Sequence, residues 1–451
     1  MAERKSRVVK RKKATRSPSR EFSFTPEMIP SWANGAKETK FLDEYRQRAW
    51  QNFEQLDMPA TSEEAWRRTD IRKLAADSFQ LPDKEKRETL PAIPEHLLES
   101  LVDEGHGGQI VFSPEGTKVH LSEEIANQGV IFSDLETAAM NHPALLEKIL
   151  GSIVKADEGK FAALATALAR NGVFLYVPKG VHVEEPLHSV LWGPGAELAY
   201  LSHLIVWVED EASVTYVHEA ASPDEAEQSM HAGIVELYAG KGSNLRFIEL
   251  QSWGEHVWNF SHERARIQKD ARLDWIFGAL GSQLTKNFSE INLEGEGGEA
   301  RMSGFYFTDG EQHLDHDTQQ NHKAANTTSD LLFKGALEEK SRSVWQGMIY
   351  VAPEAQRTDG FQANRNLVLS PQARADSIPG LEILADDVRC THGATVGKVD
   401  DEELFYLLSR GIPEKEARQL IVEGYFDPIM QRIPFDGVRA RFQKAIVQKM
   451  K

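Results

Sequence analysis

The stretch HLIVWVEDEASVTYV at residues 203–217 decides the fold, because two runs of β-forming residues flank a polar turn. The same strand–turn–strand pattern recurs as GIVELYAGKGSNLRFI at 233–248, RARIQKDARLDWI at 264–276 and SEINLEGEGGEARMSGFYF at 289–307. Four turns align at spacings of 31, 28 and 29 residues, and two later units follow them: Ala212, Ser243, Ala271 and Ala300, then Ser341 and Ala373. A fixed period of strand units is typical of a β-solenoid, whose stacked coils bury a continuous core. A β-sandwich or jelly roll is the second interpretation, since sandwiches rarely have so regular a period.

The regions on either side of the repeat have helical patterns. Upstream, apolar residues recur at three- or four-residue steps between Phe41 and Leu56, which predicts a helix. We expect two further helices at Leu135–Val154 and Gly159–Arg170, the second ending at Asn171-Gly172. Downstream, we expect helices from Asp401 to Gly411, from Pro413 to Gly424 and from Asp436 to Lys451. We therefore predict four regions: a basic, disordered arm at 1–36, a helical region at 37–172, the β-solenoid at 173–400 and a helical region at 401–451. The last region either seals the solenoid end or docks another protein.

Charge and cysteine content exclude several functions. The 451 residues carry a net charge of −17, but residues 1–20 hold nine Lys or Arg against Glu3, which leaves −25 for the rest of the chain. So acidic a body argues against broad contact with nucleic acid. No apolar run reaches the roughly 18 residues of a membrane span, and the N-terminus lacks a secretory core, so we expect a cytoplasmic protein. A single cysteine, Cys390, excludes an internal disulfide and cannot alone hold a zinc ion or an iron–sulfur cluster.

The segment ADDVRCTHGATVG at residues 385–397 is the first candidate site. On a strand, Cys390 and His392 are two residues apart and point to the same face. A thiolate beside an imidazole suits iron or zinc, whereas the alternative is a buried cysteine and a hydrogen-bonded histidine at a strand end. Two ligands fill only half of a tetrahedral site, so any metal must be shared with another chain.

Two further groups of residues carry weaker signals. The segment HLDHDTQQNH at 313–322 is dense in metal-ligand types, but we interpret it as a polar, turn-rich loop between strands, with residues His313, Asp315, His316, Asp317 and His322. Carboxylates in the expected turns could serve a solenoid hydrolase or lyase, although carboxylates in turns are usually solvated. The carboxylates concerned are Glu209, Glu211, Glu294 and Glu296. The sequence has no nucleophile elbow, Walker A loop or dinucleotide fingerprint, so we predict that the chain is not an enzyme and that any ATP-driven step belongs to a partner.

Three long blocks resemble the SufB/SufD family of iron–sulfur cluster assembly proteins. They are FAALATALARNGVFLYVPKGVHVEEPL at 161–187, HLDHDTQQNHKAANTTSDLLFKGAL at 313–337 and ADDVRCTHGATVGKVDDEELFYLLSRGI at 385–412. With EEAWRRTDIRKL at 63–74, the resemblance runs from about residue 37 to 451. The chain resembles SufD more than SufB, because Gly393 follows His392 where SufB has glutamate, and because the cysteine that accepts sulfur inside the SufB β-helix is absent.

The resemblance implies a scaffold subunit with a right-handed parallel β-helix. It implies pairing with a SufB-like paralogue through the β-helix end near residues 360–400, and docking of a SufC-like ATPase through residues 401–451. It also makes His392, with Cys390 beside it, the candidate iron or cluster ligand at the partner interface, where a transient iron–sulfur cluster would be built. A flavin in the whole complex has no fingerprint in this sequence. A hydrolase and a purely structural partner of SufB are the two rival functions.

Overall fold

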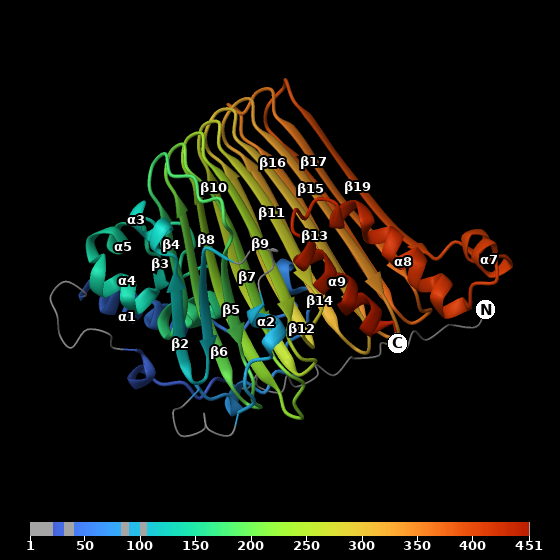
Figure 1. The fold of residues 1–451 in the computed structure, drawn as a ribbon, viewed down its shortest axis with the longest axis horizontal. Helices are drawn as coiled ribbons and strands as arrows, with labels where there is room; N and C mark the ends of the chain where they lie inside the picture. Colours follow the sequence, from blue (N-terminus) through green and yellow to red (C-terminus); the bar gives the residue numbers. More distant parts are fainter. Residues whose placement is uncertain (1–20, 31–39, 83–89, 100–105, 451) are drawn as a thin grey trace, which may run out of the picture.

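The computed structural model describes residues 21–30, 40–82, 90–99 and 106–450, and its strands form two sheets that run along one elongated body (Figure 1). Each strand from β4 onward pairs in parallel with the strand two further along the chain, so that one coil consists of two strands. The predicted β-solenoid is confirmed, with about eight turns between helical ends. The sandwich and jelly-roll interpretation is therefore wrong.

Among the described residues, the two sheets have ten and nine strands. The ten-stranded sheet contains, in spatial order, β19 Arg389–Lys398, β17 Asp359–Val368, β15 Thr328–Leu337, β13 Glu299–Thr308, β11 Arg272–Ala279, β9 Asn244–Ser252, β7 Ser213–Ala221, β5 Leu187–Trp192, β1 Gly108–Ser113 and β2 Gly116–Leu121. The nine-stranded sheet contains β18 Arg374–Ile383, β16 Arg342–Val351, β14 His313–His322, β12 Leu284–Leu293, β10 Val257–Ile267, β8 Ser229–Ala239, β6 Ala199–Val208, β4 Asn171–Val177 and β3 Ile131–Asp134.

The core lies between the sheets, because alternate side chains of every strand point inward. Tyr216, Phe247, Trp275 and Trp345 belong to one buried apolar cluster along the axis. Stacking these side chains coil upon coil lets each coil bury a face that it could not bury alone.

The coil spacing is less regular than the turn alignment suggests. Asn244 pairs with Arg272 as expected, but Arg272 pairs with Glu299, so Ala300 lies two residues out of the expected alignment. The shortening lies in the turn at 280–283: Gln251 and Trp258 are seven residues apart, whereas their partners Ala279 and Leu284 are only five apart. Ser341 and Ala373 come directly before β16 and β18 of the nine-stranded sheet, so they belong to the other row of turns.

The N-terminal region mixes helices with strands that close the first coil. The antiparallel β1–β2 hairpin ends one sheet and the antiparallel β3 ends the other, which protects both starting edges. The region expected to be helical therefore also contains β1, β2 and β3. Helices cover this end of the solenoid (Figure 1), with bounds α1 Lys40–Gln55, α2 Glu95–Leu98, α3 Glu123–Asn127, α4 Leu135–Asn141, α5 Pro143–Ile149 and α6 Lys160–Leu168.

Three sequence-based boundaries in this region were wrong. The helix expected at Leu135–Val154 is two helices, because Pro143 starts α5 and the chain turns at His142. Asn171-Gly172 starts β4 and does not cap α6, which ends at Leu168. The expected disordered arm does not include Phe24, which is buried against α1 and α6; the basic residues 1–20 lie outside the described part of the chain.

Three helices follow β19 in the described chain: α7 Asp401–Ser409, α8 Glu414–Met430 and α9 Asp436–Lys449. Helices α8 and α9 lie along the outer face of the ten-stranded sheet, whereas α7 extends past its end (Figure 1). Apolar side chains of α8 and α9, among them Phe426 and Phe442, pack on outward-facing residues of β7 to β17 such as Phe305. The second helix continues through Gly424, where we expected its end, and stops at Met430. Because α8 and α9 cover a sheet face, they do not seal the solenoid end.

Candidate functional site

The last coil of the solenoid, β18 and β19, has a neighbouring coil on one side only. Within the described chain β18 pairs with β16 and β19 pairs with β17, and no strand continues either sheet beyond them. Helix α7 extends past this end without covering it (Figure 1). The backbone groups of both edge strands are therefore free to pair with another chain.

Inward-facing side chains of this coil are exposed, although the same positions are buried in the preceding coils. On β19 the inward residues follow from pairing with buried residues of β17, and they are Cys390, His392, Ala394 and Val396. Val396 is 51% exposed, and on β18 Leu381 and Ile383 are 36% and 38% exposed. The solenoid core is thus open at this end, as if the next coil were missing.

Cys390 lies at the edge of this opening, directly over Gly360 of β17. A Cβ atom at Gly360 would lie 3.2 Å from Cys390 Sγ and 3.5 Å from His322 Nε2, so the missing side chain makes room for the thiol. Cys390 also packs against the apolar cluster around Ile349. This partial burial, together with the Asp359 carboxylate, raises the pKa of the Cys390 thiol above its ordinary value. The thiol is therefore protonated at neutral pH, and a metal must displace that proton to bind.

His392 lies on the same face of β19, as the two-residue spacing predicts, and is exposed. It is directly over Gln362, whose side-chain amide donates to the Gly380 carbonyl oxygen at 2.8 Å. The imidazole therefore lies over the open core and is accessible from outside. Its role, and that of Cys390, as a metal ligand stays a prediction.

Cys390 and His392 are not part of a larger group of metal-ligand side chains in the described residues. Over the described ranges, no three or more His, Cys, Asp or Glu side chains gather in a group suited to a metal ion. Cys390 and His392 therefore supply at most part of a ligand set.

A polar layer beneath the opening was not predicted from the sequence. Asn366 donates to Asn364 at 2.6 Å, and Ser377 of β18 donates to the same Asn364 oxygen. The Tyr306 hydroxyl of β13 donates to Asn366 from two coils deeper, past Gly335 of the intervening strand β15. Alternation along ANRN at 363–366 could have indicated two inward asparagines, but the pattern does not say which face is inward until the register is known.

The segment HLDHDTQQNH was wrongly interpreted as a loop, because it is the central strand β14. Its side chains alternate between the two faces, so His316 and His322 point into the core while His313, Asp315 and Asp317 point outward. This alternation is what separates the residues and prevents a common metal site.

The outward residues of β14 instead fix the N-terminal region. Asp315 Oδ1 is 3.1 Å from Lys286 Nζ, and both side chains are fully enclosed. The Thr69 hydroxyl, from the EEAWRRTDIRKL segment, donates to Asp315 and lies 2.9 Å from His313 Nε2. Two of the sequence blocks that carry the family resemblance therefore meet at a buried ion pair.

The turn carboxylates do not assemble into a paired acid site. Glu294 bonds Arg266 at 2.9 Å, Glu209 accepts from Trp207 at 3.1 Å, and Glu296 accepts from Asn326 at 2.8 Å. A different carboxylate pair lies inside the solenoid and was missed: Glu249 and Glu263 face each other, and burial together with their mutual repulsion raises the pKa of Glu249 well above its ordinary value.

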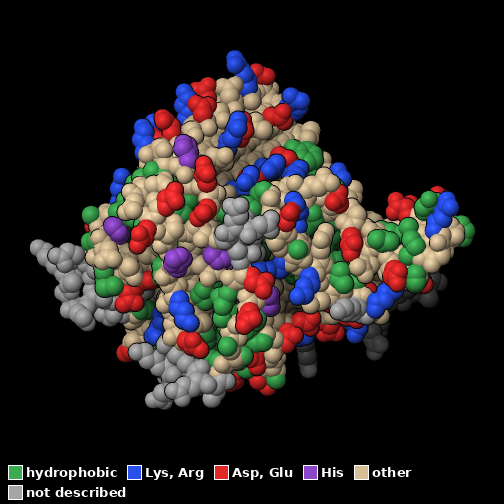
Figure 2. Space-filling model, viewed as in Figure 1, with side chains coloured by type: hydrophobic (Ala, Val, Ile, Leu, Met, Phe, Trp, Pro, Cys, Tyr) green, Lys and Arg blue, Asp and Glu red, His purple; other side chains and the backbone are tan. Residues whose placement is uncertain are grey.

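Helix α7 carries the most exposed apolar side chains of the C-terminal region. Phe405 is 71% exposed and Tyr406 56%, and Leu420 of α8 is 48% exposed. Figure 2 shows hydrophobic side chains on the lobe that α7 forms at the right, beside acidic and basic ones. Exposed apolar residues of this size on a projecting helix are typical of a protein-binding surface.

None of the helices in the described ranges is long and apolar enough to cross a membrane.

Comparison with known proteins gives matches along nearly the whole chain. The model of the SUF system FeS cluster assembly SufBD core domain matches residues 192–425, and that of the SufBD protein N-terminal region matches residues 34–188. The chain is 30% identical over 439 residues to the iron-sulfur cluster assembly protein SufD of Bacillus subtilis, covering 96% of this chain and 99% of that protein. It is 27% identical over 428 residues to the SufB protein of the same organism, covering 92% and 91%. An iron-sulfur cluster assembly SufBD family protein of Staphylococcus saprophyticus is 26% identical at the same coverage.

Proposed function

Because this chain belongs to the SufBD family of iron-sulfur cluster assembly proteins, we propose that it is the SufD-like scaffold subunit of a SUF assembly complex. It pairs with a SufB-like paralogue, docks a SufC-like ATPase and contributes side chains to the place where the cluster is built. Relatives of both kinds match this chain, so the SufD assignment rests on two features. The match to the SufD relative spans 99% of that protein, and the single cysteine, Cys390, lies on the open last coil, so none of the preceding coils has a thiol to carry sulfur.

The exposed inward face of the last coil is the observation that carries the proposal. A sister solenoid that meets β18 and β19 would supply the missing neighbour for two edge strands and would cover Val396, Leu381 and Ile383. Burying apolar side chains that are a third to a half exposed contributes about 1 kcal/mol each. Pairing of this kind requires a partner with a similar coil, which favours a paralogue.

The cluster is the cargo of this seam and not a resident cofactor. Cys390 and His392 lie within it, and the partner supplies the remaining ligands for iron and sulfide. Sulfur arrives through the SufB-like subunit, since the only thiol of this chain is Cys390 at the opening.

The ATPase docks on residues 401–451, where α7 presents its apolar side chains. Helices α8 and α9 lie along the sheet from β17 to β7, so movement of α7 reaches many coils at once. Closure of the ATPase thereby opens the seam and exposes Cys390 and His392.

The test replaces His392 with Ala, Cys390 with Ala, and both together, in a complex co-purified with the partner and the ATPase. Cluster formation is followed by absorbance under anaerobic conditions. His120, which is exposed on β2 at the other end of the same sheet, provides the matched control His120→Ala. We expect the His392 variant to lose cluster and the control to keep it. If the double variant assembles a complex with full cluster yield, the chain is only a structural partner.

A further inference from the structure

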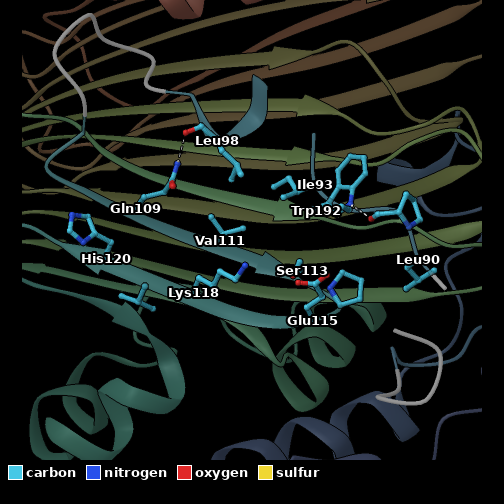
Figure 3. A pocket seen from close by; sticks show the side chains of 14 residues that line it. Leu90, Ile93, Leu98, Gln109, Val111, Ser113, Glu115, Lys118, His120 and Trp192 are labelled. Atoms are coloured by element: carbon cyan, nitrogen blue, oxygen red, sulfur yellow. Dashed lines mark hydrogen bonds between the residues drawn. The ribbon is translucent and has the colours of Figure 1, made fainter. Parts of the chain in front are cut away.

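A short strap, residues 90–98, crosses the outer face of the ten-stranded sheet at its starting end. Side chains from three separate elements hold its backbone carbonyls. Trp192 Nε1 of β5 donates to the Pro91 carbonyl at 3.0 Å, and Gln109 Nε2 of β1 donates to the Leu98 carbonyl at 3.2 Å (Figure 3). Arg441 of α9 donates to the His96 carbonyl. The strap is therefore fixed in position although only the short helix α2 lies within it.

A cavity of about 310 Å³ lies between the strap and the β1–β2 hairpin. Figure 3 shows side chains of the strap on one side and of the hairpin on the other, with Trp192 at one end. The apolar part of the wall includes Leu90, Ile93, Leu98, Val111 and Trp192. The volume is at the lower end of the roughly 300–1,000 Å³ of small-molecule sites, which are also mostly apolar with a few polar groups.

Opposite charges line the cavity at the hairpin turn. Lys118 extends along the floor toward Ser113 and Glu115 (Figure 3). Neither Lys118 nor Glu115 forms an ion pair with another residue in the described part of the chain. A ligand that carries both charges would satisfy both groups, whereas a singly charged ligand would leave one of them unpaired.

We propose that this cavity binds a small zwitterion with an apolar side chain, that is, a free α-amino acid. Its carboxylate meets Lys118, its ammonium group meets Glu115, and its side chain lies among Ile93, Leu98 and Trp192. The site is about as far from Cys390 as the solenoid allows, since β1 and β19 are near opposite ends of the same sheet. It is therefore independent of the proposed cluster site.

Arg441 connects the strap to the C-terminal helix. Besides the His96 carbonyl, its guanidinium bonds Glu219, a side chain only 4% exposed. Glu219 accepts a hydrogen bond from His188 Nε2 at 2.9 Å, and His188 Nδ1 accepts one from Gln109 Nε2 at 3.2 Å. The strap, the cavity floor and α9 thus share one hydrogen-bonded network, and the strap depends on α9 for its position.

The binding test titrates the full chain with L-leucine, L-methionine and L-phenylalanine by calorimetry. Two analogues of phenylalanine remove one charge each: 3-phenylpropionate lacks the ammonium group, and phenethylamine lacks the carboxylate. We expect one zwitterion per chain and at least tenfold weaker binding of both analogues. Lys118→Met and Glu115→Gln, both at exposed positions that tolerate substitution, each weaken binding at least tenfold, while Lys241→Met in a coil turn does not. Absence of binding, equal binding of the analogues, or full binding by the Lys118 variant overturns the proposal.

The strap is tested by hydrogen exchange in the same chain. Arg441→Met removes the bond to His96, and we expect amides of residues 90–98 to exchange at least tenfold faster and the amino acid to bind more weakly. Arg439→Met on the same helix is the control and leaves the strap unchanged, because Arg439 bonds the nearby Asp436 and the Ile433 carbonyl and does not reach the strap. If the Arg441 variant exchanges at the original rate, α9 does not hold the strap.

Discussion

Replacing Val396 with Asp tests whether the open end of the solenoid is the subunit seam. Val396 is inward-facing on the last strand and 51% exposed in the free chain. In a seam with a sister coil, the new carboxylate would be buried without a partner. Leaving an unpaired buried charge costs about 3–5 kcal/mol, so even the lower value weakens association roughly 150-fold.

The stability of the free chain should hardly change, because the side chain is exposed there. The strand itself loses up to about 1 kcal/mol when Val becomes Asp. Val119→Asp controls for this loss, since Val119 lies on β2 at the opposite edge of the same sheet and is 44% exposed. Dissociation constants for the SufB-like partner are measured by calorimetry or sedimentation. Unchanged affinity of the Val396 variant, or equal weakening by Val119→Asp, would refute the argument.

Three further predictions concern the helices, the core and pH. Phe405→Ser on α7 should abolish binding of the ATPase in a pull-down while changing the unfolding free energy by less than about 0.5 kcal/mol, because the ring is 71% exposed. Lys286→Met should destabilise the chain by about 3–5 kcal/mol in urea titration, since it leaves Asp315 buried without its cation; Lys340→Met, at an exposed ion pair, is the control. Burial lowers the pKa of His218 and His316 to about 3, from 6.5. The unfolded chain therefore binds more protons than the folded chain below pH 6.5, so the free energy of unfolding should fall as the pH is lowered from 6.5 to 4. His316→Phe should reduce this dependence of the free energy of unfolding on pH, and an unchanged dependence would contradict the prediction.

The solenoid could be predicted from the sequence because its repeat is local. Each unit, such as 203–217, contains its own two strands and turn, so β-forming runs and polar turns suffice to recognise it. The exact register could not be predicted, since turns shorten by one or two residues without changing the pattern, as between Arg272 and Glu299. The same limit hid the strand β14, whose composition of His, Asp, Gln and Asn is that of a loop. Stacking on β12 and β16 overrides that composition.

The candidate site was predicted in part. The two-residue spacing of Cys390 and His392 was enough to place them on one face. Their exposure on an uncovered coil depends on where the stack ends, which a pattern of single strands does not reveal. The bond between Arg441 and Glu219 joins residues 222 positions apart and has no local signal at all. The hairpin β1–β2 was not predicted, because two strands of six residues give a weaker local signal than a long helical pattern.

The uncovered last coil also affects how the protein must be produced and stored. A coil at the end of a stack is stabilised by a neighbouring coil on one side only, so the free energy needed to unfold it locally is lower than for the coils behind it. Exposed edge strands can pair with each other, so the purified chain without the proposed partner subunit should form end-to-end multimers as its concentration rises. Co-expression with the proposed partner subunit would let that subunit pair with these edge strands before such multimers form.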